Sequence, residues 1–590
     1  MAADQSPMNK LITEHIDIWT SAVKTKSISG RGSSKKLELY GIKKLRELII
    51  ELAIQGKLTA SLDFKGSAKK SVEDAIVAKF NLSKERNIRG DKETYSSDRA
   101  KGFPLHWETI CVGQVAHVLG GKRVPKGYKL SEQPTDFVYL RVTDMKNQSI
   151  DESDLRYISE EVFKQISRYT INTGDVYVTI AGTIGAVGTI PPHLDGMSLT
   201  ENAAKLVFSG LSKKYLVTVL QSSFVTRQFN DAVNQMAQPK LSLNSIKHTC
   251  IPIPPLEEQE YIADKVDELM ALCDQLEQQT EASIEAHQVL VTTLLDTLTN
   301  SADADELMQN WARISKHFDT LFTTEESIDQ LKQTILQLAV MGKLVPQDPS
   351  DEPAAELLKR IAEEKAQLVK EKKIKKQKVL PPISDDEKPF EQPTGWEICR
   401  LGELLPQFQN GASSRGDKEG NEIVVLRLAD IKDWQISLDD TRSIVIERKS
   451  IERYSLQEGD VLIIRVNGSA DIVGRFVTCH EDYDAIYCDH FIRMRFPVEC
   501  YMPSFLSLLG SSSIIREKIA DLFISTAGQK TVNQTHISSL ITVLPPIKEQ
   551  LRIINKVDEL LSICNQLKVR LKESKSTQLQ LTDTIVKQAV

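Results

Sequence analysis

The sequence predicts an α+β protein in which two mixed α/β domains are separated by long antiparallel coiled-coil helices, internally duplicated with pseudo-two-fold symmetry. Two observations lead to this fold class. PPLEEQEYIADKVDELMALCDQL (254–276) and PPIKEQLRIINKVDELLSICNQL (545–567) are identical at 13 of 23 positions, and each begins a heptad pattern. The segments before these helices contain short apolar runs broken by Gly, Asn and Asp, which is typical of strands.

Composition narrows the class of protein. At about 150 residues per domain, 590 residues suggest about four domains, and 41% hydrophobic with 26% charged residues is ordinary for a globular chain. The net charge of −7 argues against a binder held by charge alone, although local basic patches can still contact nucleic acid. The eight Cys form no C-x-x-C pair, so neither a zinc ribbon nor a disulfide framework is indicated. We expect a cytoplasmic protein with no membrane association, because no signal sequence or membrane-spanning stretch occurs.

Further repeats set the order of the elements. One further repeat pairs LRELIIELAIQGKL (45–58) with LKQTILQLAVMGKL (331–344). The final residues, LTDTIVKQAV (581–590), are similar to residues 331–340 and stop where GKL would follow. This permuted repeat predicts that the C-terminal helix packs beside the N-terminal region. The expected domains are an N-terminal helical region (1–100), a first mixed domain (101–250), a central long helix with helical repeat (251–345), a charged linker with a basic helix (346–390), a second mixed domain (391–543) and a C-terminal long helix (544–590).

Heptad spacing identifies the seam of the two long helices. Apolar residues recur at intervals of four and three, which predicts a coiled coil whose seam in each copy faces the other copy. The seam turns polar after residue 276, is expected to resume at Leu290 and Leu294, and the helix should continue to residue 299. Its principal members, which we also expect to serve partner docking, are Ile262, Val266, Leu269, Leu276, Ile553, Val557, Leu560 and Leu567.

Catalytic and metal-binding motifs are missing from the sequence. No phosphate-binding loop, metalloprotease helix, nucleophile elbow or amino-methyltransferase tetrapeptide occurs. The stretch with Cys479, His480, Cys488 and His490 fits no zinc pattern and has no equivalent in the first repeat. We therefore expect no catalytic residues, no metal site and no cofactor bound by this chain.

Basic, glycine-containing loops are the best candidates for contacts with DNA. Loops at 120–129 and 410–420 follow the opening strand of each mixed domain, and polar segments at 237–246 and 527–537 lie near its end. Arg and Lys can pair with guanine, and Gln and Asn with adenine. The candidate DNA-binding residues are Lys122, Arg123, Lys126, Arg141, Gln238, Lys240, Arg415, Lys418, Arg427, Gln529 and Lys530. Any one of them could instead be an ordinary exposed residue, and for Arg141 and Arg427 a structural ion pair is at least as good an interpretation.

These features together resemble a known family. Two variable α/β units, each closed by a Pro-Pro-Leu/Ile-x-Glu-Gln helix, and the LAV-x-GKL-type repeats are similar to the specificity (S) subunit of type I restriction-modification systems. The resemblance implies that the mixed domains are target recognition domains reading a bipartite double-stranded DNA target, and that the helices set the spacing. It also implies docking of two methyltransferase subunits and, through them, motor-nuclease subunits. Those partners would bring S-adenosylmethionine for adenine methylation, and ATP and magnesium.

Other interpretations remain open from the sequence alone. A recognition subunit of a related phage-defence or solitary adenine methyltransferase system without a nuclease would share the fold. A coiled-coil scaffold that binds protein rather than DNA is compatible with the acidic net charge. The Lys-rich run at 365–378 is either a solvated helix end or an arm that contacts phosphates.

Overall fold

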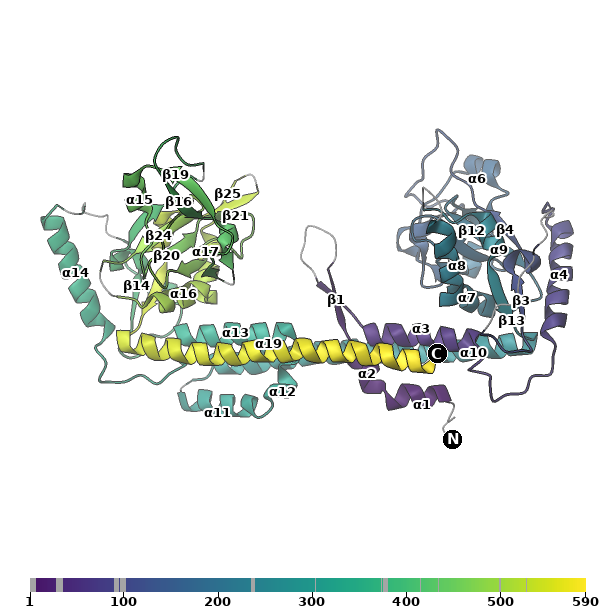
Figure 1. Cartoon of the computed structure of the whole chain (residues 1–590), viewed down its shortest axis with the longest axis horizontal. Helices are drawn as coiled ribbons and strands as arrows, with labels where there is room; N and C mark the ends of the chain where they lie inside the picture. The colour runs from purple at the N-terminus through teal and green to yellow at the C-terminus, as the bar shows by residue number, and fades with distance from the viewer. Residues whose placement is uncertain are drawn as a thin grey trace. The chain divides into compact units, whose positions relative to one another are not determined.

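The fold was obtained as a computed structural model, which describes residues 7–27, 35–89, 95, 102–234, 239–302, 304–372, 374, 380–413, 415–432, 434–497, 500–526 and 528–590 (Figure 1). The chain divides into two compact units, Met1–Ser283 with Ser574–Val590, and Ile284–Glu573. Each unit contains one mixed domain and part of both long helices, α10 (Leu256–Thr299) and α19 (Ile547–Ala589). The predicted end of the first long helix at residue 299 is confirmed. Within the described ranges, no helix combines the length and apolar character needed to traverse a bilayer.

The helical part of the first unit joins the two ends of the chain. Its elements before the mixed domain are α1 (Pro7–Glu14), α2 (Ile16–Ser21), β1 (Lys24–Ser27), β2 (Lys35–Glu38), α3 (Tyr40–Ile54) and α4 (Ala68–Glu85). Helix α3 lies alongside α10, where the Arg46 guanidinium contacts Asp274 at 2.7 Å and Glu277 at 2.6 Å (Figure 1). The Tyr40 hydroxyl donates to Asp583 of α19 at 2.7 Å. The predicted packing of the C-terminal helix beside the N-terminal region is therefore confirmed.

Three helices share one apolar core in the second unit. The end of α10 contributes Val291 and Leu298, α13 (Glu325–Val340) contributes Leu331, and α19 contributes Val557 and Leu560. Polar contacts support this packing, because Lys332 of α13 donates to Asn565 of α19 at 2.7 Å. The other helices before the mixed domain are α11 (Ala304–Ser315), α12 (Phe318–Leu321) and α14 (Ala354–Lys370). Helix α14 is the basic helix expected from the sequence, and most of the Lys-rich run beyond it lies outside the described residues.

The seam of the long helices is buried as expected, with two differences. Six of its eight members are buried, and Leu276 and Leu567 are half-buried. In the second unit the seam packs against α13, so the expectation that it faces only the other long helix was incomplete. The predicted resumption at Leu290 was wrong, since that side chain is 49% exposed and Val291 is buried instead. Val291 follows Cys273 by five turns of 3.6 residues, whereas a strict heptad reaches Leu290.

The first mixed domain is built on a four-stranded sheet of order β10-β9-β12-β4 and a three-stranded sheet of order β5-β11-β8, and β3 pairs with β13. One of the short apolar runs that were expected to form strands is β9, which is buried throughout. The elements are β3 (Glu108–Cys111), α5 (Val112–Val115), β4 (Ala116–Gly120), β5 (Tyr139–Leu140), β6 (Met145–Lys146), β7 (Ser149–Ile150), α6 (Glu160–Ile166), β8 (Thr170–Ile171), β9 (Val176–Thr179), β10 (Val187–Gly188), β11 (Met197–Leu199), β12 (Ala203–Phe208), α7 (Lys213–Gln221), α8 (Ser223–Asn234), α9 (Leu243–His248) and β13 (Cys250–Ile253).

The second mixed domain repeats this plan. Its sheets have the orders β15-β24-β20-β22, β19-β16-β23 and β21-β26-β25, and β14 pairs with β27. The elements are β14 (Glu397–Arg400), β15 (Gln407–Asn410), β16 (Asn421–Leu426), β17 (Ile431–Lys432), β18 (Gln435–Ile436), β19 (Arg442–Ile446), α15 (Arg448–Tyr454), β20 (Val461–Ile464), β21 (Val466–Asn467), β22 (Phe476–Thr478), β23 (Ala485–Tyr487), β24 (Phe491–Arg495), α16 (Pro503–Ser511), α17 (Ser513–Asp521), β25 (Ile524–Thr526), β26 (Gln529–Thr531), α18 (Gln534–Ser539) and β27 (Ile541–Leu544).

The repeated Glu-Gln pair fastens each long helix to its mixed domain. The side chain of Gln259 accepts from the Ser212 amide at 3.0 Å and donates to the Pro254 carbonyl at 2.9 Å. Gln550 does the same with the Met502 amide at 2.8 Å and the Pro545 carbonyl at 3.1 Å. Both glutamines are fully buried, so each holds the first turn of its helix to the domain that precedes it.

Candidate DNA interface

In the first mixed domain, the predicted basic loop begins against a turn that sequence analysis did not identify. The turn, Thr200–Asn202, connects β11 to β12. The Gly121 amide donates to the Ala203 carbonyl at 3.1 Å, and the Lys122 amide donates to the Leu199 carbonyl at 2.9 Å. A Cβ atom at Gly121 would lie 2.1 Å from the Thr200 carbonyl oxygen, so only glycine fits this close approach.

Loop and turn border a cleft of about 440 Å³. Arg123 is 83% exposed there, and its Nε lies 3.5 Å from Glu201 Oε1. The Tyr139 hydroxyl shares its one proton between Glu201 at 3.1 Å and the Lys122 carbonyl at 2.8 Å, and burial raises the pKa of Tyr139 to about 12. The phenol therefore stays protonated and holds the carboxylate in place. Both sides of the cleft carry hydrogen-bonding groups, and its lining includes Arg123, Tyr128, Tyr139, Arg141, Thr143, Thr200, Glu201 and Asn202.

The second mixed domain places its loop against an equivalent turn, Cys488–His490, between β23 and β24. The Gly411 amide donates to the Phe491 carbonyl at 3.1 Å, and the Ala412 amide donates to the Tyr487 carbonyl at 2.9 Å. A Cβ atom at Gly411 would lie 2.0 Å from the Cys488 carbonyl oxygen. Both domains thus begin their variable loop with a glycine pressed against the same turn.

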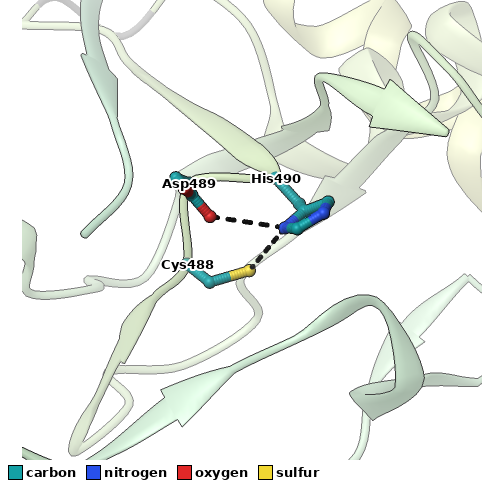
Figure 2. Close-up of side chains that lie close together, drawn as sticks. All are labelled: Cys488, Asp489 and His490. Carbon is teal, nitrogen blue, oxygen red and sulfur yellow. Dashed lines mark hydrogen bonds and ion pairs between the residues drawn. The ribbon is translucent and has the colours of Figure 1, made fainter. Parts of the chain in front are cut away.

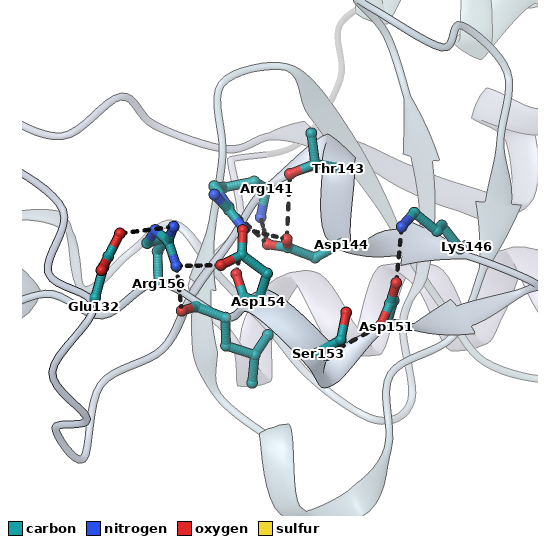
Figure 3. A network of polar contacts seen from close by, with 10 residues as sticks. Glu132, Arg141, Thr143, Asp144, Lys146, Asp151, Ser153, Asp154 and Arg156 are labelled. Atoms are coloured by element: carbon teal, nitrogen blue, oxygen red, sulfur yellow. Dashed lines mark hydrogen bonds and ion pairs between the residues drawn. The ribbon is translucent and has the colours of Figure 1, made fainter. Parts of the chain in front are cut away.

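Arg141 and Arg427 are anchored in matching ion pairs. Figure 3 shows Arg141 beside Asp144, with Nη2 to Oδ1 at 2.7 Å and Nε to Oδ2 at 3.1 Å. Arg427 meets Asp430 at 2.8 Å and 3.1 Å between the same atoms. Both carboxylates are buried, and Arg141 also contacts Asp154. Both arginines therefore form the structural ion pair that was one of the two interpretations of the sequence. Their role as DNA contacts stays a prediction.

Replacing Asp144 by Ala is expected to lower the free energy of unfolding of the first domain by about 2–3 kcal/mol, because the half-buried guanidinium of Arg141 loses its buried partner. Urea denaturation would measure the loss. Lys146→Ala is the matched control, since it removes an ion pair through its exposed partner, leaves Asp151 in place and should leave the midpoint unchanged. An unchanged midpoint in Asp144→Ala, combined with weaker DNA binding, would show that Arg141 serves the ligand rather than the fold.

The other candidate contacts lie at the surface or near it. Lys122, Lys126, Lys240, Arg415, Lys418 and Gln529 are exposed. Lys530 is half-buried in β26, where it pairs with Asn467 of β21. Gln238 lies outside the described residues. None of these positions contradicts a DNA contact, and none establishes one.

The turn Cys488–His490 also gathers three possible metal ligands. Among the described residues, Cys488, Asp489 and His490 place one ligand atom each within 4.8 Å of one another (Figure 2). Burial raises the pKa of the Cys488 thiol to about 11, so the thiolate that a metal prefers is disfavoured. The expectation of no metal site stays a prediction.

Each mixed domain has one loop-and-turn site, formed by Gly121 with Thr200–Asn202 in the first domain and by Gly411 with Cys488–His490 in the second. A protein with two such sites on the same backbone frame is a two-domain recognition protein. Residues 104–286 match the family described as "Type I restriction modification DNA specificity domain". Over 608 residues the chain is 37% identical to the type I restriction enzyme EcoEI specificity subunit of Escherichia coli, and the match covers 99% of this chain and 100% of that one. The EcoAI specificity subunit of Escherichia coli is 38% identical over 596 residues, with the same coverage. Among solved structures, the HsdS subunit from Thermoanaerobacter tengcongensis shares 19% identity at a TM-score of 0.41, over 82% of this chain and 97% of that chain.

This chain belongs to the family of type I restriction enzyme specificity subunits, the DNA-recognition components of these systems. The resemblance predicted from the duplicated helices is confirmed. Because the two E. coli relatives match over 99% of this chain, they also share its long N-terminal region and its segment at 300–390. Membership of this family decides against a coiled-coil scaffold that binds only protein.

Proposed function

We propose that the chain reads a bipartite double-stranded DNA target, one half with each mixed domain, and performs no catalysis itself. The observation that supports this proposal is that the two domains share one backbone arrangement at the loop-and-turn site but have different side chains there. Gly121 and Gly411 make the same contacts, whereas the turns that they touch read Thr-Glu-Asn and Cys-Asp-His. Two equivalent backbone arrangements that present different side chains are suited to two different half-targets.

We propose further that two methyltransferase subunits dock on the helices and bring S-adenosylmethionine to an adenine in each half-target. Motor-nuclease subunits would join through them and supply ATP and magnesium chemistry, and the complex would act in the cytoplasm. The buried seams leave exposed apolar side chains elsewhere on the long helices, including Leu272, Leu290, Leu551 and Ile563, which suit a helical partner.

Exchange of residues 102–250 for the equivalent domain of another specificity subunit is expected to change one half of the target and leave the other half intact. The reason is that each loop-and-turn site lies wholly within its own domain. Mapping of methylated adenines in cells that express the chain with a methyltransferase subunit would identify both halves. Exchange of residues 391–541 is the matched control and should alter the opposite half. A single exchange that alters both halves would count against independent readers.

A further inference from the structure

The two turns are equivalent hydrogen bond by hydrogen bond. The Thr200 amide donates to the Leu140 carbonyl at 3.1 Å, and the Cys488 amide donates to the Leu426 carbonyl at 3.0 Å. The carbonyl of Asn202 accepts from the Ile180 amide at 2.8 Å, and that of His490 accepts from the Arg465 amide at 2.7 Å. Leu140 and Leu426 stand at matching positions of the parallel strand pairs β5·β11 and β16·β23. Asn202 and His490 therefore occupy the same backbone position in the two domains.

Each of these two side chains presents a free polar edge. Asn202 lines the cleft beside Arg123, and among the described residues its amide group has no hydrogen-bond partner. The His490 side chain is 43% exposed, and its Nδ1 lies 3.3 Å from the Asp489 carboxylate (Figure 2). Nδ1 also lies 3.7 Å from the Cys488 thiol. A carboxylate is a stronger hydrogen-bond acceptor than a thiol is a donor, so the Asp489 contact favours the tautomer with its proton on Nδ1, and Nε2 is left as a hydrogen-bond acceptor.

We propose that this turn position determines one base in each half-target, with Asn202 reading adenine and His490 reading a base that carries an exocyclic amino group. The inference rests on the proposed function. The carboxamide of Asn can donate to adenine N7 and accept from its N6 amino group at the same time. A single acceptor such as His490 Nε2 can accept a hydrogen bond from the amino group of adenine or cytosine, but it finds no donor on the major-groove edge of guanine or thymine.

The preceding acid in each turn is a positioning residue. Asp489 fixes the ring of His490. Glu201, held by Tyr139, lies beside Nε of Arg123, and among the described residues neither Nη atom of Arg123 has a partner. Arg123 is thereby oriented beside Asn202 with the bidentate end of its guanidinium free, and a guanidinium in that state suits the O6 and N7 acceptors of guanine.

The test exchanges the two residues in the full-length chain, purified with a methyltransferase subunit of the same system. DNA bound from a library of random duplexes is sequenced. Asn202→His is expected to relax one position of the first half-target from adenine to adenine or cytosine. His490→Asn is expected to narrow one position of the second half-target to adenine. Discrimination at that position should change by roughly 5- to 150-fold, the range of one good base contact.

The matched controls Asn230→His and His480→Asn change exposed residues of the same domains and should leave both half-targets unchanged. Retention of the other half-target in each variant shows that the chain is folded. A two-part target that is identical in the parent, Asn202→His and His490→Asn would overturn the inference while sparing the proposed function. An equal loss of affinity for all sequences would also overturn it, since the turn would then contact only the DNA backbone. Absence of any two-part target in the parent chain would refute the proposed function itself.

Discussion

Two residues inserted into both long helices, after Ser283 in α10 and after Glu573 in α19, should lower affinity for a two-part target by roughly 10²- to 10⁴-fold, the advantage that linked binding sites provide. Each helix begins in one compact unit and ends in the other, and both insertions fall at the boundary between units. Two residues turn an α-helix by about 200°, so the recognition domains would no longer engage their half-targets together. Binding to DNA duplexes with a series of spacer lengths would measure the effect.

Four-residue insertions at the same two positions are the matched control. They add about 6 Å and nearly one full turn, and DNA rises about 3.4 Å per base pair, so the preferred spacer should lengthen by about one or two base pairs. Insertion after Leu298 is a poorer design, because that side chain is fully buried in the core of the second unit. If the four-residue variant binds well but keeps its original spacer, the helices do not set the spacing.

Most of the fold could be predicted because its signals are local. Heptad spacing, Pro-Pro starts and the repeated LAV-x-GKL-type segments identified the long helices, the helical repeats and the duplication. The error at Leu290 arose where polar residues hide the seam, so that a heptad was extended over a stretch that follows 3.6 residues per turn. The contribution of α13 to the seam was missed. Helix α13 and the other long helix both have a periodic apolar face, and the sequence does not tell which of them packs against a given seam.

Less of the candidate site could be predicted. Arg141 and Arg427 recur at the same place in both halves, and this recurrence did suggest a structural ion pair. The partners, Asp144 and Asp430, were identified only in the structure. The turns Thr200–Asn202 and Cys488–His490 share no residue type, and they meet their loops through backbone hydrogen bonds across about eighty residues of chain. A sequence carries no short-range signal for such a contact beyond the single glycine that permits it.

The buried glutamates of the Glu-Gln motif differ sharply in their surroundings. Glu258 accepts from Trp107 Nε1 at 3.0 Å and from Thr59 Oγ1 at 2.6 Å, and it lies 2.9 Å from His106 Nε2. In the second half, Val345 takes the place of Thr59 after the repeated GKL, and Gly395 takes the place of His106 before the repeated Trp-Glu pair. Among the described residues, the hydrogen bond to Glu549 is a long one of 3.5 Å from Gln347, and the indole of Trp396 lies close by. Burial is the largest influence on this carboxyl group and raises its pKa above the ordinary value of 4.5.

Glu258→Gln is expected to lower the free energy of unfolding of the first unit by about 2–4 kcal/mol. The carboxylate accepts hydrogen bonds through both oxygens, whereas an amide has one oxygen and an NH₂ group that cannot accept, so one buried donor would lose its partner.

Glu549→Gln should leave the second unit unchanged or slightly more stable at pH 7. Its raised pKa means that the folded state binds the proton more tightly than the unfolded chain, so the ionised carboxylate reduces stability as pH rises through the folded pKa. Gln removes that effect, and the gain should disappear below the ordinary value of 4.5. Urea denaturation at pH 7 and at pH 4 would compare the variants, and equal losses at pH 7 would show that the two glutamates bear the same role.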